Sequence, residues 1–256
     1  MPGAAVLEVQ IRAKDFRASR GVTRPILRDI SFGAAAGEVL ALLGRSGIGK
    51  STILRITLGL DADFEGRVEV LPTQLGVMFQ EPRLLPWLSV EDNLRLVRPD
   101  GVPEPDIAVV LNDALLPPVQ KLLPSALSLG MARRVALARA LAVDPAILVL
   151  DEPFASLDQN LAAALGARIV DRVRRRGTLV LLSTHDMDQA LAMATRILVI
   201  ANEPATLVAD IATPAHDDGA AHIRLRQDLL TRFAFLRRNG ADADGRADEP
   251  KQTPEI

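Results

Sequence analysis

The chain has 256 residues, a formal net charge of −2 and no cysteine, and 48% of its residues are hydrophobic although only 3% are aromatic. This near-neutral charge gives no general attraction to nucleic acid or anionic lipid, and the lack of cysteine excludes disulfides, thiolate catalysis and cysteine-type zinc sites. No apolar run approaches the ~20 residues of a membrane-spanning helix, and the first residues lack the pattern of a secretory signal, so we expect a soluble protein in a reducing, cytoplasmic compartment.

Three apolar runs near the beginning of the chain have the composition of strands. Residues 6–11 alternate weakly, residues 26–32 end at a Gly-Ala-Ala-Ala-Gly turn, and residues 39–43 are continuously apolar. Residues 17–25, between the first two runs, are expected to form a loop.

A glycine-rich segment, GRSGIGKST, follows the third run and precedes residues with helical spacing. Its glycines let backbone N–H groups converge on phosphate oxygens, and the following helix presents its positive end to them. In such a loop Lys50 reaches the β- and γ-phosphates, and the hydroxyl of Ser51 binds Mg²⁺. A glycine-rich turn with a chance lysine is the alternative, but the apolar strand and the helix around the loop favour a nucleoside triphosphate site. The candidate contacts are Gly44, Arg45, Ser46, Gly47, Ile48, Gly49, Lys50, Ser51 and Thr52.

The rest of the chain alternates strands with helices, apart from one long interruption. After short strands at 66–71 and 76–79, prolines are frequent from residue 81 to 127, and short helical patterns at 90–97 and 107–116 predominate. We then expect helices at 131–143, 161–176, 187–194 and 223–238, and strands at 147–150, 178–182 and 197–200. Such short, continuously apolar strands indicate a mainly parallel sheet covered on both faces, and the polar residues 239–256 are predicted to be disordered.

Six motifs occur in order along about the first 210 residues: Gly44–Ser51, Gln80, Leu127–Met131, Ile147–Glu152, Ser156–Asp158 and His185. They resemble the Walker A, Q-loop, signature, Walker B, D-loop and H-loop motifs of the ATP-binding-cassette (ABC) family. The resemblance implies an α/β fold of the P-loop NTPase class, with a mainly parallel sheet and an N-terminal antiparallel β subdomain. It also implies a cassette domain at 1–215 with a helical subdomain inserted at about 81–135, followed by a helical extension at 216–238.

The acidic pair Asp151 and Glu152 ends an apolar strand. There Asp151 can orient Mg²⁺ or its waters, and Glu152 can polarise the attacking water. By resemblance, His185 contacts the γ-phosphate, and Gln80 senses Mg²⁺ and the attacking water. Taken alone, the acidic pair would indicate a solvated strand end or helix cap. A single histidine such as His185 would more often be packed or exposed than catalytic, and a glutamine after a strand would indicate nothing. Their positions relative to the P-loop favour catalytic Glu152, His185 and Gln80, with Ser51, Gln80 and Asp151 at the metal.

The signature segment differs from the common LSGGQ, because Leu129 and Met131 replace a glycine and the glutamine. In the ABC family this motif closes over the ATP held by another subunit, which implies a homodimer or a paired cassette. Ser128 and Gly130 keep the hydroxyl and the close backbone approach, so we expect an active site that also contacts ATP through these two residues.

The adenine base usually stacks in this family on an aromatic residue upstream of the P-loop. The chain has no tyrosine, and Phe16 is the aromatic residue in a suitable place. The alternative for Phe16 is a core position at a strand end.

Residues 81–90, EPRLLPWLSV, resemble the nitrate/sulfonate/taurine importer branch. The resemblance implies that Leu84, Leu85 and Trp87 receive a membrane permease, although packing inside the helical subdomain is the alternative. It further implies an importer ATPase on the inner face of the membrane, with a substrate-binding protein as an indirect partner and a small anion such as nitrate, sulfonate or taurine as substrate. No nucleic acid partner is expected. A lipid or solvent-tolerance transporter and a non-transport ABC ATPase remain alternative functions.

Overall fold

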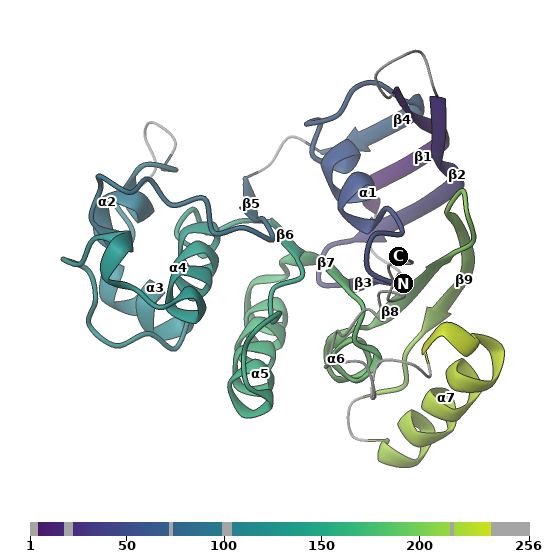
Figure 1. Cartoon of the computed structure of the whole chain (residues 1–256). Coiled ribbons are helices and arrows are strands. Elements are labelled where there is room, and N and C mark those ends of the chain that lie inside the picture. Colours follow the sequence, from purple (N-terminus) through teal and green to yellow (C-terminus); the bar gives the residue numbers. More distant parts are fainter. Residues whose placement is uncertain (1–4, 18–22, 72–73, 99–103, 216–217, 237–256) are drawn as a thin grey trace, which may run out of the picture.

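The computed structural model describes residues 5–17, 23–71, 74–98, 104–215 and 218–236, and Figure 1 shows its elements in chain order. The expected tail at 239–256 and the end of the last expected helix lie outside these ranges. Among the helices that are described, none is long and apolar enough to cross a membrane.

A six-stranded sheet forms the centre of the molecule, in the order β5-β6-β7-β3-β8-β9. All neighbouring strands are parallel except β8 and β9, which run antiparallel. The strands are β3 (Val39–Leu43), β5 (Leu75–Met78), β6 (Ile147–Asp151), β7 (Leu179–Thr184), β8 (Arg196–Ala201) and β9 (Thr206–Ala212). Because the neighbouring β3, β6 and β7 are parallel, their carboxyl ends meet at one edge, where a ligand is expected to bind.

A second, antiparallel sheet contains β2 (Thr23–Ala35), β1 (Ala5–Arg17) and β4 (Glu65–Val70), in that order. The predicted antiparallel layer is therefore confirmed, but β1 and β2 are longer than expected. Arg17 pairs with Thr23 and Asp15 with Pro25, so the ends of the expected 17–25 loop belong to a long hairpin.

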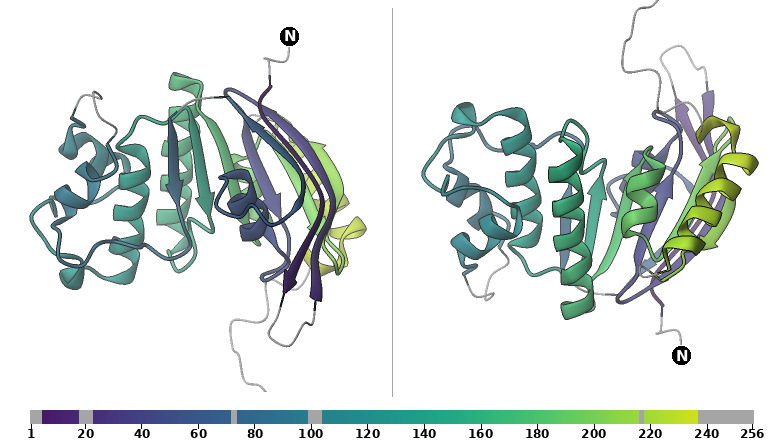
Figure 2. Two further views of the ribbon diagram at one scale, coloured as in Figure 1. Left: turned by 90° about the horizontal axis from the view of Figure 1, so that it is seen from above. Right: turned by 90° about the horizontal axis from the view of Figure 1, so that it is seen from below.

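Both faces of the central sheet are covered. Alternate residues of β3 point to opposite sides and belong to different core clusters. Ala41 and Leu43 belong to a core cluster with the helices α5 (Gln159–Arg176) and α6 (Met187–Met193). Leu40 and Leu42 belong to another cluster, with α1 (Lys50–Thr57) and the antiparallel sheet. Figure 2 shows α1 between the two sheets, and α5 and α6 side by side on the opposite face with α7 (Gly219–Arg232).

The helical part lies at one end of the molecule and contains α2 (Val90–Arg95), α3 (Ile107–Asp113), a 3₁₀ turn (Pro124–Ala126) and α4 (Leu129–Leu141) (Figure 1). Helix α4 packs closely against the edge strand β5. A Cβ atom at Gly76 would lie 2.2 Å from the carbonyl oxygen of Ala140, so only glycine permits this approach. Helix α4 therefore connects the central sheet to the helical part.

Strand β9 and helix α7 differ further from the prediction. Strand β9 was not expected, because it is a half-exposed edge strand whose pattern is less apolar than those of its neighbours. Helix α7 begins at Gly219 and ends at Arg232, whereas the sequence predicted 223–238. Its start is set by Asp218, whose side chain accepts a hydrogen bond from the N–H of Ala221, as an N-cap residue does.

Candidate functional site: a nucleotide pocket

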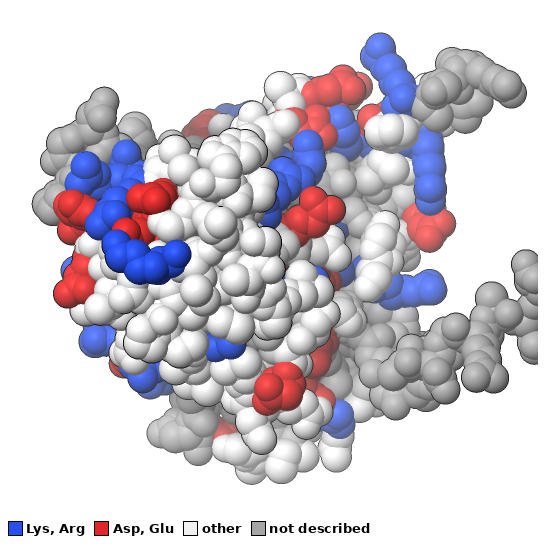
Figure 3. Space-filling view, turned by 60° about the vertical axis from the view of Figure 1, so that its left-hand side comes forward, with Lys and Arg blue, Asp and Glu red and all other residues white. Residues whose placement is uncertain are grey.

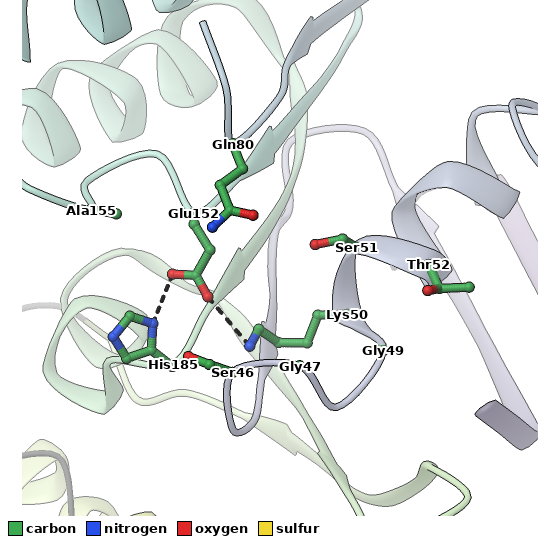
Figure 4. A pocket seen from close by; sticks show the side chains of 10 residues that line it. All are labelled: Ser46, Gly47, Gly49, Lys50, Ser51, Thr52, Gln80, Glu152, Ala155 and His185. Carbon is green, nitrogen blue, oxygen red and sulfur yellow. Dashed lines mark hydrogen bonds and ion pairs between the residues drawn. The ribbon is translucent and has the colours of Figure 1, made fainter. Parts of the chain in front are cut away.

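The glycine-rich loop connects the end of β3 to the start of α1 (Figure 4). Gly47 and Gly49 have φ angles of 76° and 117°, which glycine adopts more easily than other residues. A Cβ at Gly44 would lie 2.5 Å from the carbonyl oxygen of Ile200, so this position also requires glycine. Gly49 is the N-cap of α1 and has no side chain to cap it, so the first N–H groups of the helix are suited to an anion.

Lys50 lies under the loop and is 4% exposed. Its Nζ donates hydrogen bonds to the carbonyl oxygens of Gly44 (2.9 Å) and Arg45 (3.0 Å), and lies 3.3 Å from Oε1 of Glu152. Burial lowers the pKa of Lys50, while the charges of Glu152 and Asp151 act in the opposite direction. The ammonium group of Lys50 is thus held beneath the loop by oxygen atoms, and phosphate oxygens can replace these contacts.

Asp151 is the last residue of β6 and is 9% exposed. Its Oδ1 accepts hydrogen bonds from the hydroxyls of Ser51, at 3.0 Å, and Ser183, at 2.6 Å. The P-loop serine and the acidic strand end are therefore brought together, as the sequence predicts. Ser183 was not predicted; the available signal was a polar residue at the end of the apolar strand β7.

Glu152 leaves the strand direction, with a φ angle of 48° that is uncommon for a residue other than glycine. Such a conformation costs about 1–3 kcal/mol and persists only where its surroundings hold it. Here the N–H of Glu152 donates to the hydroxyl of Ser183 (3.1 Å) and to its carbonyl oxygen (3.2 Å). The turn directs the carboxylate into the pocket, where Oε2 lies 2.9 Å from Nδ1 of His185 (Figure 4).

The resulting pocket has a volume of about 230 Å³. It is lined by Ser46, Gly47, Gly49, Lys50, Ser51, Thr52, Gln80, Glu152, Ala155 and His185 (Figure 4). The three predicted catalytic residues thus lie around one space with most of the P-loop. The predicted site residues that do not line it are Gly44, Arg45, Ile48, Phe16, Ser128, Gly130 and the predicted metal ligand Asp151. Ala155 lines it without having been predicted.

The signature segment forms the start of α4, two residues earlier than the sequence predicted. Ser128 is the N-cap, and its hydroxyl accepts a hydrogen bond from the N–H of Met131 at 3.2 Å. Leu129 is 57% exposed. An apolar side chain therefore stands at the surface where the family motif has glycine.

Two aromatic residues with open alternatives are both exposed. Phe16 is 60% exposed on β1, so its core alternative is wrong. Trp87 is 71% exposed, so it does not pack inside the helical part. The neighbouring Leu84, by contrast, is partly buried and packs against the core, which agrees with the packing alternative for this residue. Residues 82–89, which include Trp87, are called the Trp87 segment below.

Comparison with known proteins places this geometry in a family. Residues 27–155 match the family model described as ABC transporter. An aliphatic sulfonates import ATP-binding protein, SsuB 2 of Burkholderia lata, is 40% identical, over 90% of this chain and 86% of that protein. The chain belongs to the ABC transporter family. As a member of it, the chain is an ATP-hydrolysing cassette, as the motifs predict.

Other known proteins are similar to this chain in sequence or in structure. The SsuB 1 protein of Pseudomonas syringae pv. syringae, also named an aliphatic sulfonates import ATP-binding protein, is 36% identical over 89% of this chain and 95% of its own length. Among solved structures, a dimeric ATP-binding cassette, MJ0796, in a post-hydrolysis state bound to ADP and Pi is 24% identical, with a TM-score of 0.73 over 82% of this chain and 99% of that chain. The structure of cbiO1 from Clostridium perfringens, part of the ABC transporter complex cbiONQ, has a TM-score of 0.67 at 22% identity, over 90% of this chain and 96% of that chain. The structural likenesses confirm the predicted cassette fold.

Proposed function

We propose that this ABC cassette hydrolyses ATP to drive import of a small anion of the aliphatic sulfonate class through a separate permease. The observation that carries the chemistry is the carboxylate of Glu152, which lies between Lys50 and His185 in the P-loop pocket. The import direction and the sulfonate class are supported by the names of the relatives, which match this chain over most of its length.

In the proposed reaction, phosphate oxygens take over the contacts that Lys50 makes with Gly44, Arg45 and Glu152. This exchange leaves the carboxylate of Glu152 available to a water molecule. Glu152 accepts a proton as the water oxygen attacks the γ-phosphorus, the bond to the bridging oxygen breaks, and ADP and phosphate are formed. Such general-base assistance typically contributes 10²–10⁴ in rate. His185 keeps Glu152 oriented and contacts the γ-phosphate.

The residues near the P-loop fit Mg²⁺. The hydroxyl of Ser51 and the carboxylate of Asp151 are hard oxygen donors 3.0 Å apart, and Gln80 adds an amide oxygen at the pocket. When bound, Mg²⁺ would neutralise charge on the phosphates. In the same proposal, Ser51, Asp151 and Gln80 hold the ion, and the other P-loop residues hold the triphosphate.

The rest of the nucleotide extends beyond this pocket. The exposed ring of Phe16 on β1 offers a stacking face for adenine. Ser128 and Gly130 lie outside the pocket of their own chain and are proposed to close over ATP in a second cassette. Residues 1–215 would then act as the cassette domain, with 216–238 as a helical extension.

The permease is proposed to dock at Leu84, Leu85 and Trp87, which would place the cassette on the inner face of the membrane. Exposed aromatic residues are typical anchors of protein interfaces. Figure 3, turned so that the helical part comes forward, shows mostly uncharged side chains over the centre of that face, with acidic and basic side chains interspersed around it. A substrate-binding protein would act indirectly, through the permease.

Uptake in the native cell tests this proposal. A strain without the gene, complemented with the parent chain or with Glu152→Gln, is given a labelled alkanesulfonate or labelled nitrate. We expect alkanesulfonate uptake with the parent chain and none with the variant. Equal alkanesulfonate uptake with and without the gene would contradict the proposed import function. Uptake of nitrate alone would show that the substrate is nitrate and not an aliphatic sulfonate.

A further inference from the structure

The Trp87 segment has no helix or strand of its own, yet two side chains hold its backbone. We infer that Asn93 on α2 and Arg139 on α4 are positioning residues that hold this segment and α4 as one body, so that nucleotide-linked movement of α4 reaches Trp87. The inference rests on the proposed function, in which Trp87 docks the permease and the start of α4 closes over ATP in a second cassette.

Asn93 holds the second half of the segment. Its side chain is completely buried, at 0% exposure. Oδ1 accepts a hydrogen bond from the N–H of Leu85 at 2.8 Å, and Nδ2 donates to the carbonyl oxygens of Leu85 (3.2 Å), Leu88 (3.1 Å) and Ser89 (3.0 Å). Backbone groups outside regular structure need such partners when they are buried. Only an amide both donates and accepts here, because a carboxylate of the same shape has no donor.

Arg139 holds the first half. Its Nη1 donates to the carbonyl oxygen of Arg83, and its Nη2 to that of Pro82, both at 2.8 Å. Burial lowers the pKa of Arg139, so the carbonyl oxygens support a guanidinium that has lost much of its water. Arginine makes this contact from two separate nitrogens in a fixed planar fork, whereas lysine carries all its donors on one atom at the end of a flexible chain.

The same helix also contacts the rim of the nucleotide pocket. Arg133, near the start of α4, donates a hydrogen bond to the carbonyl oxygen of Ala155, which lines the pocket. Physical contacts therefore run from Ala155 through Arg133, along α4 and through Arg139 to the first residues of the Trp87 segment. A measurement of how ATP changes the environment of Trp87 tests this path directly.

Trp87 is the only tryptophan of the chain, and there is no tyrosine, so intrinsic tryptophan fluorescence reports on this segment alone. The full chain is titrated with ATP and Mg²⁺ in a Glu152→Gln background, which is expected to bind ATP without turning it over. Acrylamide quenching and anisotropy of Trp87 are recorded, and ATP affinity is measured separately by calorimetry. We expect ATP to change both fluorescence signals.

Arg139→Lys should keep the ATP affinity and lose the ATP-induced change in Trp87 fluorescence. Arg134→Lys is the matched control, because Arg134 lies on the same helix and also donates to a carbonyl oxygen, that of Leu115, outside the Trp87 segment. This control should keep the change. If Arg139→Lys does not fold, Arg139→Gln provides the same comparison.

Asn93→Asp should lower the anisotropy of Trp87 and increase its quenching even without ATP, because the segment loses its donors. The inference is overturned if Arg139→Lys or Arg139→Gln responds like the parent, if Arg134→Lys loses the change as well, or if ATP binds without altering Trp87 in any variant. Loss of ATP binding in the Glu152→Gln background itself would instead contradict the proposed function.

Discussion

At the scale of single residues, the pocket depends on a serine that does no chemistry. Ser183 donates to Asp151 and accepts from the N–H of Glu152, so one hydroxyl fixes both acidic residues. The backbone carbonyl of Ser183 provides a second acceptor for the same N–H. The uncommon φ angle of Glu152 is thereby held from two sides, and its carboxylate stays directed at Lys50 and His185.

Ser183→Ala should therefore lower both stability and turnover. Removing one partner of a buried polar group typically costs 1–3 kcal/mol, and we expect a loss of about that size in the free energy of unfolding. The measurements are urea unfolding and phosphate release. Thr57→Ser is a suitable control, because it keeps the hydroxyl that donates to the carbonyl oxygen of Ile53 in α1 and lies away from Glu152. Unchanged turnover in Ser183→Ala would show that Glu152 does not need this support.

At the scale of elements, helix α4 has a different task at each end. Its C-terminal part packs against β5 and holds the Trp87 segment, whereas its N-terminus presents Ser128 and the exposed Leu129. The cap formed by Ser128 typically contributes ~1 kcal/mol. A substitution at this end should act on closure over a second nucleotide rather than on nucleotide binding in the same chain.

Ser128→Arg should abolish turnover, because it removes the cap and places bulk and charge at the proposed closing surface. Leu129→Gly should change turnover only modestly. Both variants should bind ATP like the parent, as calorimetry can establish. A large gain in turnover for Leu129→Gly would instead mean that the native signature is degenerate and that the cassette is a weak or regulatory one.

Sequence patterns predicted the elements whose burial is continuous and missed contacts that form only in three dimensions. The apolar runs at β3, β6 and β7 are buried throughout, so the expected parallel core is confirmed. Edge strand β9 was missed because it is only partly buried and its pattern is less apolar than those of its neighbours. Arg139 and Ser183 contact partners that are far away in the sequence, and Asn93 contacts a nearby segment that has no regular structure. The exposure of Phe16 and Trp87 likewise depends on tertiary packing, so the sequence left both alternatives open.

At the scale of the whole molecule, the proposed permease contacts Leu84, Leu85 and Trp87 do not line the ATP pocket, so mutation can separate the two functions. Trp87→Ala should leave the thermal midpoint and ATP affinity nearly unchanged, because exposed substitutions usually change stability by about ±0.5 kcal/mol. Loss of a central aromatic anchor typically costs ~2 kcal/mol or more of association, so recovery of the permease in a pull-down should fall strongly. A variant that retains the permease fully would exclude Trp87 as an anchor.

We propose that ATP is bound and hydrolysed in the pocket between the P-loop and Glu152. The most direct measurement compares ATP affinity and phosphate release for the parent chain, Lys50→Ala and Glu152→Gln. We predict that Lys50→Ala loses ATP binding, whereas Glu152→Gln binds ATP and loses at least ~10² in turnover, the lower limit for a general base. Parental ATP affinity in Lys50→Ala, or near-parental turnover in Glu152→Gln, would contradict the account.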